Sequence, residues 1–245
     1  MSHSFIAQVP IRKAGWVDKV KPLLGFRSPL IPQCLEVFLV VALSLGLLRV
    51  LAQPFAGSIR WLFIPLVLVT AAFFPPLLRK RSIKTLGIHG QAIPRSIYLC
   101  ILASLVVFPA VLGAMVLAKR YAWSIPLVPA VPGGDWGEWI LYQFFYVAVA
   151  EELFFRGYLQ GSLLRMVEKS ELTRRSFWNG MTVAVSALVF ALAHWYILGT
   201  AIAAATFFPG LIFGWLFLRT RTLTAPILFH GMANTFYAVG VSFLG

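Results

Sequence analysis

The chain has 245 residues, of which 60% are hydrophobic and only 12% are charged, whereas about a quarter of the residues in a soluble domain are charged. This deficit excludes an ordinary soluble globular protein and indicates that lipid surrounds most of the chain. The formal net charge is +13, an excess that could indicate nucleic-acid binding if the basic residues shared one soluble face. They cluster between apolar runs instead, so they indicate membrane topology and no nucleic-acid partner.

Seven apolar stretches each approach the roughly 20 residues that a helix needs to cross a bilayer. We expect membrane-spanning helices at about residues 33–52, 61–78, 96–118, 139–160, 178–197, 200–218 and 223–244. The sequence therefore predicts an all-α polytopic membrane protein of about seven to eight transmembrane helices, with its functional site inside the helix bundle.

The distribution of Lys and Arg predicts the direction in which the chain crosses the membrane. If alternate loops face the cytoplasm, sixteen basic residues lie on that side and four on the other, with Arg156 inside a span. The positive-inside rule then places the N-terminus in the cytoplasm and the C-terminus outside. The loops holding Lys80, Lys169 and Arg221 are expected inside, and the Pro-rich loop near Pro129 outside. We expect a multi-pass protein of the inner, cytoplasmic membrane if the source is bacterial.

We expect a single membrane domain over residues 1–245, because no internal repeat or second domain is evident. We expect residues 1–32 to form a cytoplasmic or interfacial N-terminal segment without a cleaved signal. Apolar residues at helical spacing between Trp16 and Leu24 fit either a short interfacial helix or an amphipathic loop.

Four residues in or beside apolar runs are interpreted as structural. Cys34 and Cys100 have no paired spacing that suggests a disulfide framework or a metal knuckle, so we expect buried free thiols. Glu36 and Arg49 lie near the ends of the first span, where their charged groups can reach the interface.

Ionisable groups in the middle of a span need a partner or a function, because each costs about 2.5 to 3.5 kcal/mol on insertion scales. The later spans hold five such groups and one amide: Glu151, Glu152, Arg156, His194, His230 and Asn234. Any one of them is often structural in membrane proteins. Six together favour a functional site.

The spacing of these residues suggests how they are arranged. Glu152 and Arg156 are four residues apart, with the acidic residue first, which favours an ion pair on one helical face. Glu151 is then left without a local partner. His230 and Asn234 are also four apart, so both side chains project from one stripe of the last span.

Several known ways of cleaving a peptide inside a membrane do not fit this sequence. Neither mid-span histidine has a second histidine four residues away, which excludes an HExxH zinc site. The only aspartates, Asp18 and Asp135, lie outside the expected spans, which excludes an intramembrane aspartyl dyad. Ser162 lacks the surrounding G-x-S-x-G turn of a serine nucleophile. Glutamate and histidine remain as candidate catalytic groups.

Three ordered motifs on apolar helices make the resemblance specific. They are Glu151-Glu152-Leu153-Phe154-Phe155-Arg156 (EExxxR), Phe190-Ala191-Leu192-Ala193-His194 (FxxxH) and His230-Gly231-Met232-Ala233-Asn234 (HxxxN). Together they resemble the motifs of the CPBP family, the CAAX-processing and bacteriocin-processing membrane endopeptidases that include the Rce1-like prenyl-protein proteases. The resemblance covers about residues 136–244, which would form the motif-bearing catalytic core.

The resemblance implies a glutamate intramembrane endopeptidase. Glu151 with His194 would activate a water molecule, and His230 with Asn234 would form an oxyanion hole. Glu152 and Arg156 would fix the helix. No metal or other cofactor is required by this interpretation, although a Glu and two His could in principle bind zinc. The implied partners are membrane lipids and a peptide or protein substrate, including lipidated or membrane-anchored ones.

Two other functions remain as alternatives. Intramembrane Glu, Arg and His also build the proton pathways of transporters, but the inverted repeats of many transporters are not evident here. A non-enzymatic scaffold or immunity-type protein would keep the fold with a dormant site. The intact motifs argue against such decay.

Overall fold

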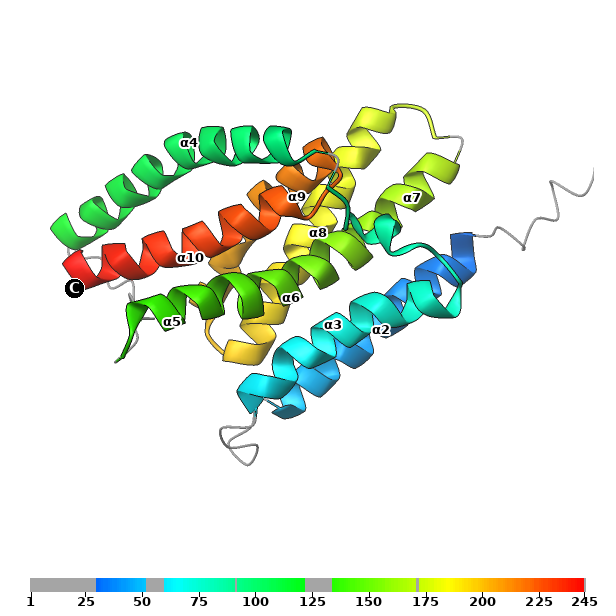
Figure 1. The fold of residues 1–245 in the computed structure, drawn as a ribbon, viewed down its shortest axis with the longest axis horizontal. Helices are drawn as coiled ribbons and strands as arrows, with labels where there is room; N and C mark the ends of the chain where they lie inside the picture. The colour runs from blue at the N-terminus through cyan, green and yellow to red at the C-terminus, as the bar shows by residue number, and fades with distance from the viewer. Residues whose placement is uncertain (1–29, 52–59, 91, 122–133, 171, 245) are drawn as a thin grey trace, which may run out of the picture.

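The computed structural model describes residues 30–51, 60–90, 92–121, 134–170 and 172–244. Within these ranges the chain is helical and contains no strand, which confirms the all-α prediction (Figure 1). The helices are α2 (Leu30–Leu51), α3 (Arg60–Leu78), η2 (Ile83–Leu86), α4 (Ile93–Arg120), α5 (Trp136–Leu141), η3 (Tyr142–Ala148), α6 (Val149–Glu152), η4 (Leu153–Gln160), α7 (Gly161–Lys169), α8 (Arg175–Leu198), η5 (Ala201–Thr206), α9 (Phe207–Thr220) and α10 (Thr224–Leu244). The expected interfacial segment near Trp16 and the tip of the Pro-rich loop lie outside the described residues.

Each of the seven expected spans coincides with a helix or a run of helices. Four helical segments, at residues 31–51, 93–120, 175–198 and 201–220, are long and apolar enough to cross a membrane, and residues 63–78 form a shorter apolar helix. The chain is thus an all-α polytopic membrane protein. The two remaining expected spans, 139–160 and 223–244, hold five of the six candidate site residues.

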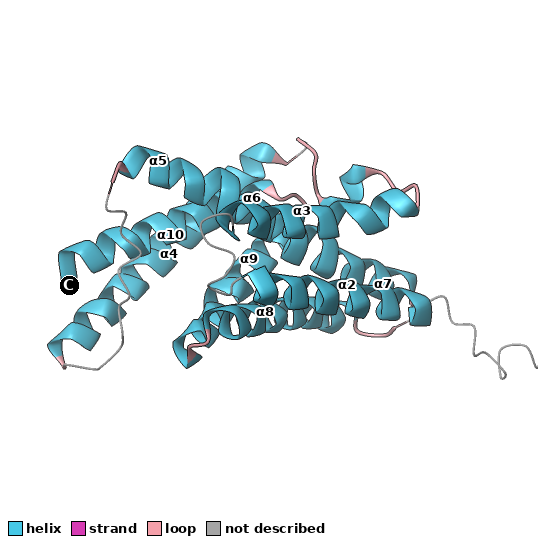
Figure 2. Cartoon of the chain, turned by 90° about the horizontal axis from the view of Figure 1, so that it is seen from below, coloured by secondary structure: helices cyan, strands magenta, loops and turns pink. Residues whose placement is uncertain are grey.

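The segment from α5 to α7 is one continuous helix over 136–169, in which two π-helical stretches, η3 and η4, alternate with α-helical turns. We call it the central helix. It lies between the α2–α3 pair on one side and the α4–α10 pair on the other, while α8 and α9 cover it from behind (Figures 1 and 2). The central helix therefore contacts the other helices that contribute to the candidate site.

Glycines allow helix α9 to pack closely against α8. Gly210 and Gly214 are one turn apart, and a Cβ atom at each would lie 3.2 Å from Cβ of Ala187 and 3.0 Å from Cγ1 of Val183, respectively. Small residues at this spacing let helix backbones approach in membranes, where no hydrophobic driving force draws helices together. The close approach also brings the α9 backbone within reach of side chains from the central helix.

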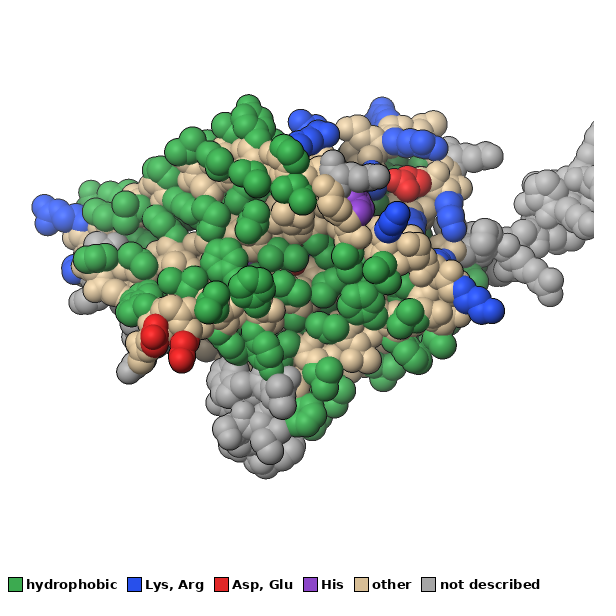
Figure 3. All heavy atoms as spheres, in the orientation of Figure 1, with side chains coloured by type: hydrophobic (Ala, Val, Ile, Leu, Met, Phe, Trp, Pro, Cys, Tyr) green, Lys and Arg blue, Asp and Glu red, His purple; other side chains and the backbone are tan. Residues whose placement is uncertain are grey.

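Most of the basic side chains visible in Figure 3 collect at one end of the bundle, around the end of α3, η2, α7 and the start of α8, whereas at the other end α4 finishes with Lys119 and Arg120. The exposed Lys80, Lys169 and Arg221 belong to the more basic end, whereas the α5 end of the central helix begins with Asp135 and Glu138. The segregation is the one that the positive-inside rule describes. Which end faces the cytoplasm stays a prediction.

The structure describes the surroundings of the four residues that the sequence analysis interpreted as structural, Cys34, Glu36, Arg49 and Cys100. Both cysteines are free, and Cys100 is buried as expected, but the expectation was wrong for Cys34, which is exposed. Cys34 lies on α2, an outer helix of the bundle that exposes large apolar side chains along its length. Glu36 forms an ion pair with Arg79, and Arg49 donates to the Ile197 carbonyl over 3.4 Å.

Candidate functional site

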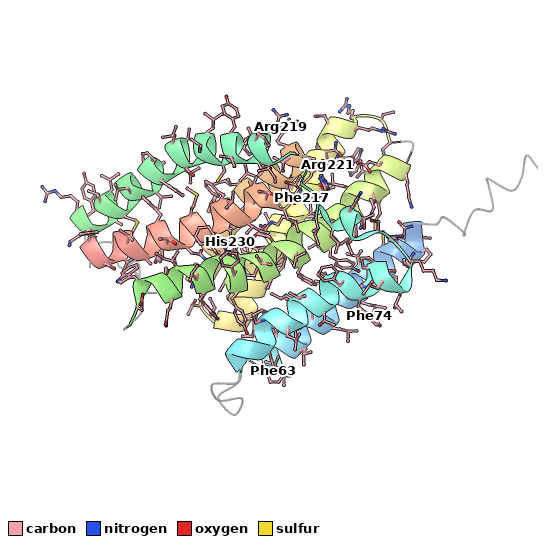
Figure 4. All side chains as sticks on the ribbon, viewed as in Figure 1. Phe63, Phe74, Phe217, Arg219, Arg221 and His230 are labelled. Carbon is pink, nitrogen blue, oxygen red and sulfur yellow. The ribbon has the colours of Figure 1, made fainter. Side chains whose placement is uncertain are left out.

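The candidate site lies where α8 and α10 cross the central helix. Figure 4 shows His230 on α10 in the middle of the bundle, at the point where α10 passes the central helix. Glu151 and Glu152 approach it from α6, and His194 from α8. The structure therefore brings these four residues together from three separate helices, and Arg156 pairs with Glu152 beside them.

Glu152 is the most enclosed member of the site. Its side chain and that of Arg156 are both 0% exposed, and Nη1 of Arg156 donates to Oε1 of Glu152 over 3.1 Å. The structure thus contains the ion pair that the four-residue spacing predicts. The same Oε1 atom lies 2.8 Å from Nδ1 of His230, a contact that the sequence did not predict. Glu152 consequently connects the central helix to α10.

Arg156 is held by aromatic rings and by a backbone carbonyl as well as by Glu152. Its guanidinium carbon lies 4.5 Å from the ring centre of Phe190 and 5.0 Å from that of Phe213. Its Nη2 atom donates to the carbonyl of Gly210 over 3.1 Å. One turn later Gln160 donates to the carbonyl of Gly214 over 2.9 Å. Arg156 therefore joins the central helix to α8 and α9.

Glu151 faces both histidines. Its Oε2 atom lies 3.9 Å from Nε2 of His194 and 3.8 Å from Nε2 of His230. Both distances exceed that of a direct hydrogen bond, and at such a separation a bridging water has to be considered. The Glu151 and His194 side chains are about one fifth exposed, at 18% and 23%. This part of the site is therefore more accessible than the Glu152–Arg156 pair.

The orientation of the His194 ring follows from the contact that its Nδ1 atom makes. Nδ1 lies 2.9 Å from the carbonyl oxygen of Phe190. A carbonyl can only accept a hydrogen bond, so Nδ1 carries the proton. In the neutral ring, Nε2 then presents a lone pair towards Glu151.

The ring of His230 is fixed on two sides. Phe213 stacks on it with ring centres 4.6 Å apart and an angle of 14° between the planes, while Nδ1 is held by Glu152. With Nδ1 occupied, Nε2 points towards Glu151.

Asn234 lies one turn further along α10 and does not join the cluster directly. Its Nδ2 atom donates to Oε1 of Gln143 over 2.9 Å. Its proposed companion His230 contacts the two glutamates instead. The structure therefore places Asn234 beside the four clustered residues, on the same face of α10.

Gln143 was missed because α-helical periodicity places it off the Glu151 face. Eight residues of α-helix turn the chain about 80° past two full turns, at 3.6 residues per turn. Tyr142–Ala148 is π-helical, however, and each residue in a π-helix turns the chain less. Gln143 and Glu151 therefore both face α10. A polar residue within an expected span was the signal that could have identified Gln143, and Gln160 as well.

The possibility of a metal site rests on Glu151, His194 and His230. Among the described residues, no group of three or more His, Cys, Asp or Glu side chains is arranged to hold a metal ion.

Comparison with known proteins supports the interpretation of the motifs. Residues 135–236 match the family model described as Type II CAAX prenyl endopeptidase Rce1-like, and this range contains all six candidate residues. Searches of curated proteins and of solved structures gave no match. The family indicates a protease of the intramembrane CAAX type, and hence a peptide or protein substrate. The resemblance is thereby confirmed over residues 135–236, which match the Rce1-like family model.

Proposed function

We propose that the protein is an intramembrane endopeptidase that hydrolyses a peptide bond with a water molecule activated by Glu151 and His194. The observation that carries the proposal is the position of Glu151 Oε2, 3.8 and 3.9 Å from the Nε2 atoms of two histidines inside a helix bundle. This oxygen is buried and has no hydrogen-bond partner among the described residues. A water molecule can lie between these three atoms.

Glu151 and His194 suit complementary tasks on that water. The carboxylate of Glu151 can take one proton, and the Nε2 lone pair of His194 can accept the second O–H. The water oxygen is then held with its own lone pairs free for attack. Of the two residues, Glu151 would be the general base and His194 would orient the water.

His230 can stabilise negative charge on the substrate only if its Nε2 carries a proton. Its Nδ1 proton is directed to Glu152, whose carboxylate is paired with Arg156, so donation from both nitrogens requires the imidazolium form. Two glutamates, one arginine and one imidazolium have no net charge.

The proposed reaction proceeds as follows. The water oxygen bonds to the carbonyl carbon of the substrate while one water proton passes to Glu151. The developing oxyanion accepts hydrogen bonds from Nε2 of His230 and Nδ2 of Asn234. The carbon–nitrogen bond then breaks, and the proton on Glu151 passes to the leaving amine. Both products depart with Glu151 again a carboxylate.

The proposed substrates are membrane-associated proteins or proteins with a C-terminal signal. The matched family is described as a CAAX prenyl endopeptidase, so a farnesylated peptide ending in a CAAX sequence is the first probe. The unprenylated peptide shows whether the lipid is needed. Other C-terminal signals are then found by comparing the proteomes of membranes that contain active or inactive protein.

The experiment that tests the proposal compares the wild-type protein with Glu151→Gln in lipid nanodiscs. The substitution keeps the shape of the side chain and removes only its ionisable group, so we expect a normally folded protein with almost no cleavage of the peptide, measured by mass spectrometry. Glu138→Gln is the matched control, because Glu138 is exposed near the start of the same helix. Near-normal cleavage by Glu151→Gln would refute the assignment.

A further inference from the structure

We propose that Gln143 is a positioning residue that holds the amide of Asn234 in the orientation from which it donates to the substrate. The inference rests on the proposed function of Asn234 as an oxyanion donor. Nδ2 of Asn234 donates one hydrogen to Oε1 of Gln143 over 2.9 Å. An amide nitrogen has two hydrogens, so one remains for the substrate oxygen.

The backbone around this contact is fixed by close packing. Gly231 on α10 faces Phe144 on the central helix, and a Cβ atom on Gly231 would lie only 2.5 Å from the Phe144 ring. The Phe144 ring therefore lies directly against the α10 backbone at Gly231. Gln143 precedes Phe144 in the chain, and Asn234 lies three residues after Gly231. The packing of Phe144 on Gly231 therefore holds the Gln143 and Asn234 side chains close to each other.

The π-helical stretch Tyr142–Ala148 gives this contact its direction. A regular α-helix would turn Gln143 away from the face that carries Glu151, as shown above. The wider turns bring Gln143 and Glu151 to the same side of the central helix, opposite Asn234 and His230, respectively. Glu151, the proposed proton acceptor, and Gln143, which supports the amide of Asn234, thus belong to the same central helix.

A purely structural role is the competing explanation, because amide pairs commonly join helices in membranes. The two roles differ in what they change. A structural contact contributes to stability alone, whereas a positioning residue lowers turnover only while the group that it positions is present. A double-mutant cycle separates these outcomes.

The test uses full-length wild-type protein, Gln143→Met, Asn234→Ala and the double variant in nanodiscs, with the farnesylated CAAX peptide as the probe. Met keeps the length of the side chain and removes the carbonyl acceptor. We expect Gln143→Met to lower kcat about three- to tenfold at unchanged KM, as for the loss of one neutral hydrogen bond. Asn234→Ala should lower kcat about 10²- to 10³-fold, and Gln143→Met should add nothing to it.

Two outcomes would overturn the proposal for Gln143. They are an equal fall in kcat caused by Gln143→Met with and without Asn234, and a change in KM alone. Phe145→Met is the control, since Phe145 lies on the same π-helical stretch and is 73% exposed. If Gln143→Met accumulates poorly, Gln143→Asn replaces it, because its amide is one methylene too short to reach Asn234.

The same variants distinguish this proposal from the proposed function itself. No turnover by the wild type, or full turnover by Asn234→Ala, would contradict the proposed function. Melting temperatures of the four proteins measure the coupling between the two side chains without any substrate. Additive melting temperatures would show that the contact is absent, and would refute the role of Gln143 independently.

Discussion

Nδ1 of His230 lies 2.8 Å from the same Glu152 oxygen that accepts a hydrogen bond from Arg156. The two nitrogens of the His230 ring consequently face two different glutamates, Nδ1 towards Glu152 and Nε2 towards Glu151. Nδ1 therefore helps to join α10 to the central helix, while Nε2 is available to contact a substrate. The two tasks can be separated by substitution.

We predict that His230→Asn is nearly as stable as the wild type but slow. The amide nitrogen of Asn can take the place of Nδ1 and still donate to Glu152, while nothing replaces Nε2. Turnover should fall about 10²- to 10³-fold, as for an oxyanion donor, with little change in KM. His230→Gln should be less stable but should keep more turnover. Its amide reaches the Nε2 position, and Glu152 is left without the donor that Nδ1 supplied. Melting temperature and kcat of both variants test the prediction, and equal behaviour would contradict it.

We predict that Glu152→Gln destabilises the protein. Arg156 is fully buried and would lose its counter-charge, and breaking a buried ion pair typically costs about 3 to 5 kcal/mol. Purified yield and melting temperature should both fall. Glu168→Gln provides the control, because it breaks an exposed pair with Arg221 and should change stability by less than about 1 kcal/mol. A Glu152→Gln protein of wild-type stability that had lost activity alone would show that Glu152 is chemical rather than structural.

The double variant Glu152→Gln with Arg156→Gln should regain part of the lost stability, since it removes the stranded charge. The recovery should be incomplete. Arg156 also donates to the carbonyl of Gly210 and stacks on Phe190, and glutamine cannot reproduce both contacts. Full recovery would mean that these contacts contribute little.

The helices were largely predictable from sequence because apolar runs of the required length leave few alternatives in a membrane. Each of the seven predicted spans is helical, but the central helix continues nine residues past its predicted end at residue 160, through α7. Gly161–Lys169 carries polar residues on one face, so it does not form an apolar run. Hydropathy alone therefore does not predict that the helix continues beyond the lipid.

Helical spacing alone predicted contacts only between partners on one helix, whereas the pairing of Glu151 with His194, now 3.9 Å apart, came from the resemblance of the motifs. The Glu152–Arg156 pair follows from α-helical spacing. The contact of His230 with Glu152, by contrast, depends on how α10 packs on the central helix, and that of Asn234 with Gln143 depends on a π-helical stretch. Neither interhelical packing nor a change of helical period can be read from a single sequence.

We predict that activity survives thorough chelation. Glutamate and histidine together supply the base, the water acceptor and the oxyanion donors of the proposed reaction, so no step requires a metal. The purified protein should cleave the farnesylated CAAX peptide at an unchanged rate after treatment with a chelator, and elemental analysis should find no stoichiometric zinc. Loss of activity that one added metal restores would assign Glu151 and the two histidines to a metal site instead.

We predict that the basic end of the bundle faces the cytoplasm. The central helix extends over 34 residues from Trp136 to Lys169, which is at most about 50 Å at the 1.5 Å per residue of an α-helix. A bilayer including its headgroup regions is about 40 to 45 Å thick. Both ends of this helix can therefore reach water, and thiol reagents can report on both.

The labelling experiment starts from a protein in which Cys34 and Cys100 are replaced by alanine, since Cys34 is exposed. Single cysteines are then placed at Lys169 and at Glu138, which are exposed at opposite ends of the central helix. Position 129, in the Pro-rich loop that we expect outside, is a second test position. An impermeant reagent added to sealed cells should label positions 138 and 129 but reach 169 only after the membrane is opened, because the Lys- and Arg-rich loops resist translocation. Labelling of 169 in sealed cells, with none at 138 or 129, would reverse the predicted orientation.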